Sequence, residues 1–403
     1  MLFLKIQGGL TAIKVKINNL SKGGFSVKKH LLALVLCCAV FLGCSPAALA
    51  FAVDAKAAVL MDAATGRIIF EQNAHESLPP ASTTKILTAL LTLENVTDLQ
   101  KTVTLPADFV NVGESGVYLE AGETHTFLDL LYALLLRSAN DAGQALAIGV
   151  SGSEEAFVAL MNKRSQELGL KDSSWANPHG LDDDKHLTSA YDLAKITQEA
   201  FKHDLFNEII VAESWTMPWQ GNSYDRSLYN HNQFLDLYEG GDGVKTGYTG
   251  QSGSCLVASA TRDGMRLIGV VLGCADQAHY DEMIKLMDYG FSGYEAVKVG
   301  SAGDVVGSVK VINGNITAVN AVLGQDVVLA VEKGERFKPQ PAYDFPAALE
   351  APFQASEPIG LATYLDTAGN KAEAPIYAAK GATLYTFGLV FKSCWQAFIA
   401  AFL

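Results

Sequence analysis

Residues 81–93 limit the possible folds of this chain more than any other segment. They follow Pro79-Pro80 and predict a helix whose apolar side chains cover most of its circumference: Ile86, Leu87, Leu90, Leu91 and Leu93. A helix with apolar residues on nearly every side is buried within a domain, because a surface helix keeps one polar face. The rest of the chain must therefore supply elements that enclose it.

The segments around this helix predict an α+β domain over residues 51–293. A hairpin is expected over 54–71, around the Gly-containing turn at residues 64–67. Periodicity predicts further helices at 126–136, 141–150, 154–168, 189–202 and 281–289, and strands at 243–246, 254–260 and 266–273. A sheet, then helices, then a sheet again is typical of this class, so we expect the first and last strands in one sheet.

The residue pattern of the sequence changes after Gly293. Short β-branched runs such as 309–311 and 327–331 alternate with Gly and Asn turns, and several prolines interrupt the residues that follow. This pattern predicts a small all-β domain over residues 294–379. It contains no cluster of titratable residues that would suggest chemistry.

The N-terminal residues 1–50 predict a signal peptide. Lys28 and Lys29 precede an apolar run over 31–43, and Ala48-Leu49-Ala50 forms a small-residue cleavage pattern. The apolar run is shorter than the roughly 20 residues that a spanning helix needs, so cleavage after Ala50 is the favoured interpretation. An uncleaved membrane anchor and lipidation of Cys44 are alternatives.

The C-terminal residues 380–403 predict an amphipathic tail that associates with a membrane surface. Lys392, Ser393 and Gln396 fall on one helical face, and aromatic and aliphatic residues cover the rest. A spanning helix and a terminal helix packed on the body are alternatives.

Charge and cysteine content narrow the range of possible binding partners and cofactors. Six of the 30 Lys and Arg residues but none of the 43 Asp and Glu residues lie within 1–50, which leaves a strongly acidic body. Such a body is a poor candidate for nucleic-acid binding. Cys255 and Cys274 are expected to be free thiols, and without a CxxC pattern we expect no metal and no cofactor.

Ser82 and Lys85 are the first residues suited to chemistry. They lie three residues apart at the start of the buried helix, so their side chains share a face. The helix N-terminus disfavours a proton on a nearby ammonium, which would let Lys85 take the Ser82 proton. An ordinary N-cap serine is the alternative, and Ser26 and Lys29 repeat the spacing in the signal region.

Two further short motifs follow in the chain. Ser138-Ala139-Asn140 lies between two predicted helices, where a capping turn is the alternative interpretation. Lys245-Thr246-Gly247 lies on a predicted strand, with Lys245 and Gly247 on one face. A glycine there leaves room for a ligand backbone, whereas the alternative is a solvent-facing lysine before a turn.

The three motifs in this order resemble the signature of the penicillin-binding proteins and serine β-lactamases. Longer segments such as Asn177-Pro178-His179-Gly180-Leu181-Asp182 and Asp242–Gly247 are similar to the low-molecular-mass D-alanyl-D-alanine carboxypeptidases, peptidase family S11, and the likeness spans about residues 54–376. It implies a β-lactamase/DD-peptidase-like catalytic domain, with an antiparallel sheet and helices, followed by the small all-β domain.

The resemblance implies a role for each motif residue. Ser82 would be the nucleophile that forms an acyl-enzyme, and Lys85 would be its general base. Ser138 would relay the proton toward the leaving D-alanine, while Asn140 would orient the substrate amide and Lys85.

The resemblance also implies how the substrate is held. Lys245 and Thr246 would meet the terminal carboxylate, and the backbone N–H groups of Ser82 and Tyr248 would form the oxyanion hole. Tyr248 stands where relatives often have His, and His279 stands where many carry an Arg. His179 is expected to be structural.

The activity implied is a D-Ala-D-Ala carboxypeptidase that trims peptidoglycan stem peptides on the outer face of the cytoplasmic membrane and is inhibited covalently by β-lactams. One alternative is a class A-like β-lactamase, but the chain lacks the E-x-x-L-N pattern of those enzymes. The other is an inactive peptidoglycan-binding scaffold, which would be expected to lack Ser82, Lys85 or Lys245.

Overall fold

A computed structural model describes residues 51–335 and 337–385, together with positions 388, 391, 395, 396, 398 and 399. The predicted signal peptide and half of the predicted tail lie outside these residues.

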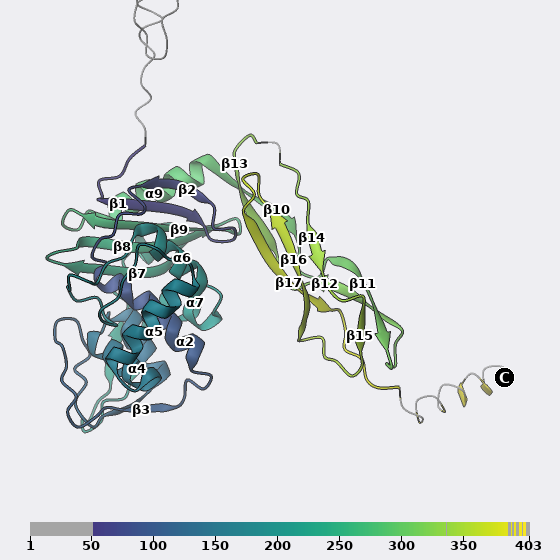
Figure 1. The fold of residues 1–403 in the computed structure, drawn as a ribbon, viewed down its shortest axis with the longest axis horizontal. Helices are drawn as coiled ribbons and strands as arrows, with labels where there is room; N and C mark the ends of the chain where they lie inside the picture. Colours follow the sequence, from purple (N-terminus) through teal and green to yellow (C-terminus); the bar gives the residue numbers. More distant parts are fainter. Residues whose placement is uncertain are drawn as a thin grey trace, which may run out of the picture. The chain divides into compact units, whose positions relative to one another are not determined.

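An antiparallel sheet of five strands, in the order β2-β1-β9-β8-β7, forms one layer of the first domain (Figure 1). Its strands are β1 (Ala57–Asp62), β2 (Ile68–Gln72), β7 (Gly241–Thr249), β8 (Gly253–Arg262) and β9 (Met265–Cys274). Val59 of β1 pairs with Val270 of β9. The prediction that the first and last strands share one sheet is therefore confirmed, and β7 is left at one edge.

Helices cover both faces of this sheet. The helical elements are η1 (Ala81–Thr84), α2 (Lys85–Asn95), α3 (Phe127–Leu136), α4 (Asn140–Ser151), α5 (Glu154–Glu167), α6 (Ala190–Ala200), α7 (Asp204–Val211), α8 (Phe234–Leu237) and α9 (His279–Gly293). Helix α9 packs on β8 and β9, and α6 packs on β1 and β9. The helix predicted from residue 81 is present, but its first turn is a 3-10 turn rather than α-helix.

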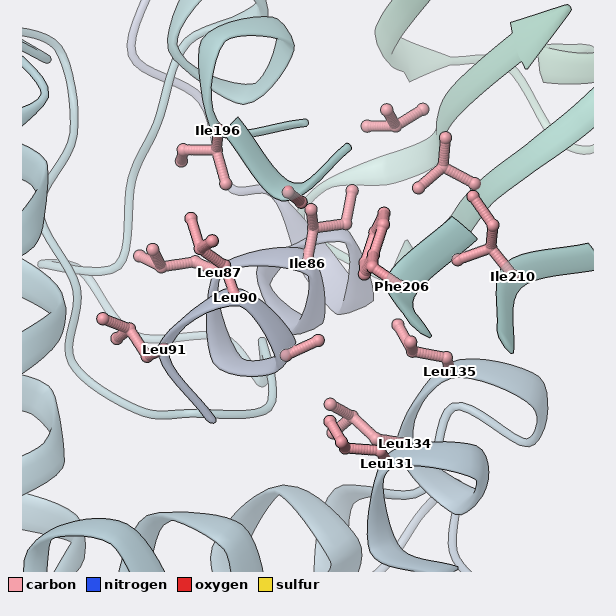
Figure 2. Packing of buried hydrophobic residues seen from close by; sticks show 14 of the residues in the cluster. Ile86, Leu87, Leu90, Leu91, Leu131, Leu134, Leu135, Ile196, Phe206 and Ile210 are labelled. Atoms are coloured by element: carbon pink, nitrogen blue, oxygen red, sulfur yellow. The ribbon is translucent and has the colours of Figure 1, made fainter. Parts of the chain in front are cut away.

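Helix α2 lies in the middle of the main hydrophobic core (Figure 2). Every residue from Lys85 to Thr92 is buried. This agrees with the prediction that apolar side chains cover most of the helix circumference. Side chains from three other helices enclose it: Leu131, Leu134 and Leu135 of α3, Ile196 of α6, and Phe206 and Ile210 of α7.

Short two-stranded ribbons complete the first domain and were not predicted. They pair β3 (Thr102–Thr104) with β4 (Thr124–Thr126), and β5 (Ser214–Met217) with β6 (Arg226–Tyr229). Runs of three or four residues carry too little alternation to stand out in a sequence.

The second domain is all-β, as predicted, and has its own hydrophobic core. A six-stranded sheet contains β14 (Ala342–Asp344), β16 (Pro358–Leu365), β17 (Lys371–Ala378), β12 (Ala318–Leu323), β11 (Val305–Ile312) and β15 (Ala348–Glu350). A two-stranded sheet pairs β10 (Tyr294–Gly300) with β13 (Val327–Glu332). The proline-interrupted part of the sequence thus also forms strands, with Pro358 as the first residue of β16.

The last continuously described residues belong to this second domain. Ala382 is buried in its core and pairs with Phe353, while Tyr385 N donates to Asn313 O at 2.8 Å. No helix among the described residues is long and apolar enough to cross a membrane.

Cys255 of β8 and Cys274 of β9 are free and buried, which agrees with the expectation of free thiols. Cys274 lies opposite Ser254, the neighbour of Cys255. Burial raises the pKa of the Cys255 thiol to about 11 and that of Cys274 to about 12, so both are protonated thiols at neutral pH.

Candidate active site

Ser82 and Lys85 face each other where η1 passes into α2. The Nζ atom of Lys85 lies 2.8 Å from Ser82 Oγ. Ser82 is half-buried and Lys85 is fully buried at the base of the site. The predicted serine and lysine pair is therefore formed in the structure.

Two carbonyl oxygens hold the amine of Lys85. Nζ donates to Asn140 Oδ1 at 2.8 Å and to the backbone oxygen of His179 at 2.5 Å. A neutral amine has two N–H donors and one lone pair. With both donors taken by carbonyls, the lone pair is left to face Ser82 Oγ, which is the arrangement a general base needs.

Electrostatics favour the neutral form of Lys85. Burial lowers the pKa of Lys85 well below its usual range, and the charge of Lys245 lowers it further. Asp141 and Glu114 oppose this shift in part, but burial is the largest cause.

The Ser138–Asn140 turn joins Lys85 to a covering loop. Ser138 lies between α3 and α4 at φ +58°, a left-handed conformation that is uncommon for serine. Asn140 Nδ2 donates to Gly113 O at 3.0 Å and its backbone N–H donates to Ser115 O at 2.8 Å. The Ser138 hydroxyl is nearly buried, and no other described residue hydrogen-bonds to it.

Asp141 is a structural residue of the site that was not predicted from the sequence motifs. Its carboxylate accepts from the backbone N–H groups of Val117 at 3.1 Å and Leu119 at 3.0 Å, and from Asn111 Nδ2 at 2.8 Å. It therefore fixes the loop of residues 111–119 against the start of α4. The sequence carries no signal for these contacts, because they join residues 22 to 30 positions apart.

The Lys245–Gly247 motif lies on the edge strand β7. Lys245 is 2% exposed and its Nζ donates to Thr246 O at 2.9 Å, so the solvent-facing alternative is wrong. Burial lowers the pKa of Lys245 to about 7. A Cβ on Gly247 would lie 3.0 Å from Ser82 N, so the Ser82 backbone approaches this glycine closely; room for a ligand backbone there stays a prediction.

Residues 177–182 form a turn that packs against the segment preceding Ser82. Asn177 Oδ1 accepts from Gly180 N at 2.7 Å, and Gly180 has φ +95°. A Cβ at Gly180 would lie 1.9 Å from the Ala81 carbonyl oxygen, so only glycine fits. Asp182 accepts from Thr249 Oγ1 at 2.6 Å and ties the turn to the end of β7.

Two buried histidines flank this turn without entering the site through their rings. Burial and the charge of Lys85 lower the pKa of His179 to about 3, and only its main-chain oxygen contacts Lys85. His186 Nε2 lies 2.8 Å from Thr84 Oγ1, which itself donates to Ala81 O at 2.8 Å. His186 thus supports the turn that carries Ser82, a role that the sequence did not indicate.

The remaining predicted residues lie at the rim. Tyr248 is 63% exposed near the end of β7, where it pairs with Ser254 of β8. His279 begins α9 and its ring packs on Tyr280, so it makes none of the hydrogen bonds that join the motifs. In the described part of the chain, no group of three His, Cys, Asp or Glu side chains is placed to hold a metal ion.

Comparisons with known proteins agree with this geometry. Residues 44–276 match the model of the peptidase S11 family, described as D-alanyl-D-alanine carboxypeptidase, and residues 294–382 match the C-terminal domain of penicillin-binding protein 5. The chain is 33% identical to the D-alanyl-D-alanine carboxypeptidase DacF of Bacillus subtilis, over 87% of this chain and 94% of DacF. DacC of Escherichia coli is 31% identical over 76% of this chain and 79% of DacC.

Solved structures of related proteins are also similar to this chain. Penicillin-binding protein 5 of Haemophilus influenzae superposes with a TM-score of 0.61 at 29% identity, covering 83% of this chain and 98% of that one. A peptidoglycan synthesis regulatory factor of Streptococcus pneumoniae gives 0.66 at 29% identity, covering 82% and 100%. The predicted fold class and family are both confirmed.

We predict that Gly180→Ala destabilises the protein much more than Gly169→Ala. Both glycines have positive φ, so each alanine costs about 1 kcal/mol of backbone strain. Only Gly180 also meets a carbonyl oxygen, which should add about 1–3 kcal/mol of overpacking. Urea unfolding followed by tryptophan fluorescence measures both losses. Equal losses would show that the turn carrying Ala81 shifts without cost.

Proposed function

The chain belongs to the D-alanyl-D-alanine carboxypeptidase family, peptidase S11, and from this premise we propose that it removes the terminal D-alanine of peptidoglycan pentapeptides through an acyl-enzyme on Ser82. One observation carries the proposal: Lys85 Nζ lies 2.8 Å from Ser82 Oγ while two carbonyl oxygens occupy its N–H donors. This arrangement makes the lysine a base for the serine.

Acylation follows from the arrangement of the three motifs. Lys85 Nζ takes the Ser82 proton as Oγ attacks the carbonyl carbon of the penultimate D-alanine. The backbone N–H groups of Ser82 and Tyr248 stabilise the oxyanion. The proton then passes from Lys85 through Ser138 to the leaving nitrogen, the C–N bond breaks, and D-alanine departs. Water attacks the Ser82 ester in the second half-reaction and restores the serine.

In this proposal the polar groups around Ser82 and Lys85 orient the substrate. Asn140, which already bonds Lys85, meets the amide on the acyl side of the scissile bond. Lys245 and Thr246 meet the terminal carboxylate of the peptide, or the carboxylate of a β-lactam. The buried Lys245 suits this role because a charge in a low-dielectric site attracts a carboxylate strongly.

The proposed location is the outer face of the cytoplasmic membrane. Residues 1–50 would direct export and residues from 386 onward would bind the lipid surface, with the β-domain as a spacer. Support comes from tail aromatics at helical spacing: Phe391 and Trp395 have ring centroids 6.3 Å apart, and Trp395 and Phe398 have centroids 6.0 Å apart. All three are exposed, and such a row suits the headgroup region.

We predict that Lys85→Arg abolishes acylation almost as completely as Ser82→Ala. Arginine keeps a positive charge but remains protonated at any working pH, so it cannot accept the Ser82 proton. Intact-mass spectrometry after incubation with benzylpenicillin should find a stable adduct on the wild type and none on either variant. Near-native acylation of Lys85→Arg would show that Lys85 acts only as a charge. Rapid loss of the wild-type adduct would instead indicate a β-lactamase.

The two lysines predict a bell-shaped pH profile of kcat/KM. Activity should rise with pH as Lys85 becomes neutral, since burial lowers its pKa. It should fall as pH increases through about 7, because Lys245 then loses the charge that attracts the carboxylate. Hydrolysis of diacetyl-Lys-D-Ala-D-Ala between pH 5 and 10 measures both limbs. In Lys245→Arg the falling limb should move above the measured range, and an unchanged limb would assign it to another group.

Removal of residues 386–403 should release an active enzyme from the membrane. The cut falls after Tyr385 because residues 382–385 are bonded to the β-domain, so an earlier cut would disturb its core. Cell fractionation and D-alanine release should find the truncated protein soluble and active when it is expressed with residues 1–50. Continued membrane association would point to an uncleaved signal or a lipidated Cys44.

A further inference from the structure

The loop of residues 111–119 holds Asn140 in place, yet the part that does so has little packing of its own. Gly113 O accepts from the Asn140 side chain at 3.0 Å, and Ser115 O accepts from its main-chain N–H at 2.8 Å. Residues 112–115, which include both acceptors, are exposed and form no helix or strand. Burial of apolar side chains therefore does not fix this stretch, so polar contacts elsewhere in the loop must do so.

The backbone of the loop is also strained. Glu114 has φ +58° and Tyr118 has φ +60°, a left-handed region that residues other than glycine seldom adopt. Such conformations persist only where the surrounding structure determines them. Loss of those surrounding contacts would let the loop relax and would move the acceptors Gly113 and Ser115.

Arg226 of β6 supplies such contacts from the side opposite to Asp141 in hydrogen-bonding character. Its guanidinium donates through Nε to Val117 O at 2.7 Å and through Nη2 to Tyr118 O at 3.0 Å. The Asp141 carboxylate accepts from the N–H groups of Val117 and Leu119. One residue thus holds the donors of this segment and another holds its acceptors, including that of the strained Tyr118.

Arg226 is itself held rigidly. It is 5% exposed, its Nη2 donates to the two carboxylate oxygens of Glu123 at 2.9 Å and 3.0 Å, and its Nη1 donates to Pro218 O at 3.2 Å. Its guanidinium lies 4.6 Å from the centroid of the Trp219 ring. A planar guanidinium can serve all these partners at once because its donors are fixed in a fork, whereas a lysine ammonium is a single point charge.

The position of the loop also affects the charge state of Lys85. The charged and titratable groups that face Lys85 are Lys245, Asp141, Glu114, His179 and His186. Burial is the largest influence on the pKa of Lys85 and lowers it, whereas the charge of Glu114, on the loop itself, is the smallest and raises it. Displacement of the loop would admit water to the amine, and the resulting rise in its pKa should outweigh the departure of Glu114.

We propose that Arg226 is a positioning residue for acylation, which acts through the loop of residues 111–119 to place Asn140 against Lys85. With Asn140 Oδ1 in place, the lone pair of the Lys85 amine faces Ser82 Oγ. Without Arg226 the loop relaxes, Asn140 shifts, and water competes for the amine. The inference rests on the proposed function, because it concerns the same base and nucleophile, and it adds a residue that lies outside all three motifs.

The test removes Arg226 without leaving a buried charge unpaired. The variant combines Arg226→Met with Glu123→Gln, because the carboxylate alone would lose its partner. Stopped-flow fluorescence measures the rate of acylation by benzylpenicillin between pH 5 and 9. At pH 7 the rate should fall at least about ten-fold, since small displacements of reacting groups are costly. The ratio of variant to wild-type rates should rise with pH, because the better-solvated Lys85 becomes neutral only at higher pH.

Three single variants serve as controls. Glu123→Gln keeps both contacts of Arg226 with the loop and should keep most of the rate. Arg226→Lys keeps the charge beside Glu123 but not the fork, so it should fold and show a smaller loss with the same pH dependence. Arg164→Met removes an arginine of α5 that pairs with Glu94 and Glu199, and it should react like the wild type at every pH.

The other outcomes contradict the inference in distinguishable ways. An equal loss at every pH would limit Arg226 to a role in stability, and wild-type rates in both Arg226 variants would leave it no role in acylation. Far-UV circular dichroism verifies folding, and if the double variant does not fold, the pH dependence of Arg226→Lys decides the question. A wild type that forms no benzylpenicillin adduct at all overturns the proposed function, and the inference with it.

Discussion

Burial of the Lys85 amine is the constraint on which the rest of the site depends. An ammonium removed from water is costly, so burial favours the neutral amine, and that amine needs partners for its N–H groups. The partners are Asn140 Oδ1 and His179 O, which arrive from segments 55 and 94 residues away in the chain. In the proposed mechanism the serine is thus activated by tertiary structure, although it lies only three residues from Lys85.

Close contacts between backbone segments, together with the Asp141 carboxylate, hold the residues around Lys85 in place. Gly180 lets the turn of His179 touch Ala81, and Gly247 lets strand β7 touch Ser82. Asp141 binds the loop that receives the hydrogen bonds of Asn140. Little in this shell can move independently, because helix α2 below it is enclosed by the main core. The stability of the domain therefore sustains two buried lysines, and the charge of Lys245 favours the neutral form of Lys85.

The features that could be predicted from the sequence are those that local pattern determines. The apolar circumference of α2, the hairpin and the long strands were predicted, as were the three motifs. The roles of Asp141 and His186 were missed because their partners are distant in sequence. The approach of the Ser82 backbone to Gly247 was not predicted, since a pattern cannot say which backbone approaches a glycine. The strands after residue 339 were obscured by prolines, which sheets accept at strand ends and edges.

The two buried cysteines bear on how the protein withstands an oxidising environment. An oxidising compartment converts exposed thiolates to disulfides, but the thiols of Cys255 and Cys274 are both covered and held protonated, so they present no nucleophile to an oxidant. That protection exists only in the folded state. Unfolding exposes the thiols of Cys255 and Cys274, which can then crosslink between chains. Heat damage in an oxidising compartment should therefore become irreversible through sulfur chemistry, even where the chain itself could refold.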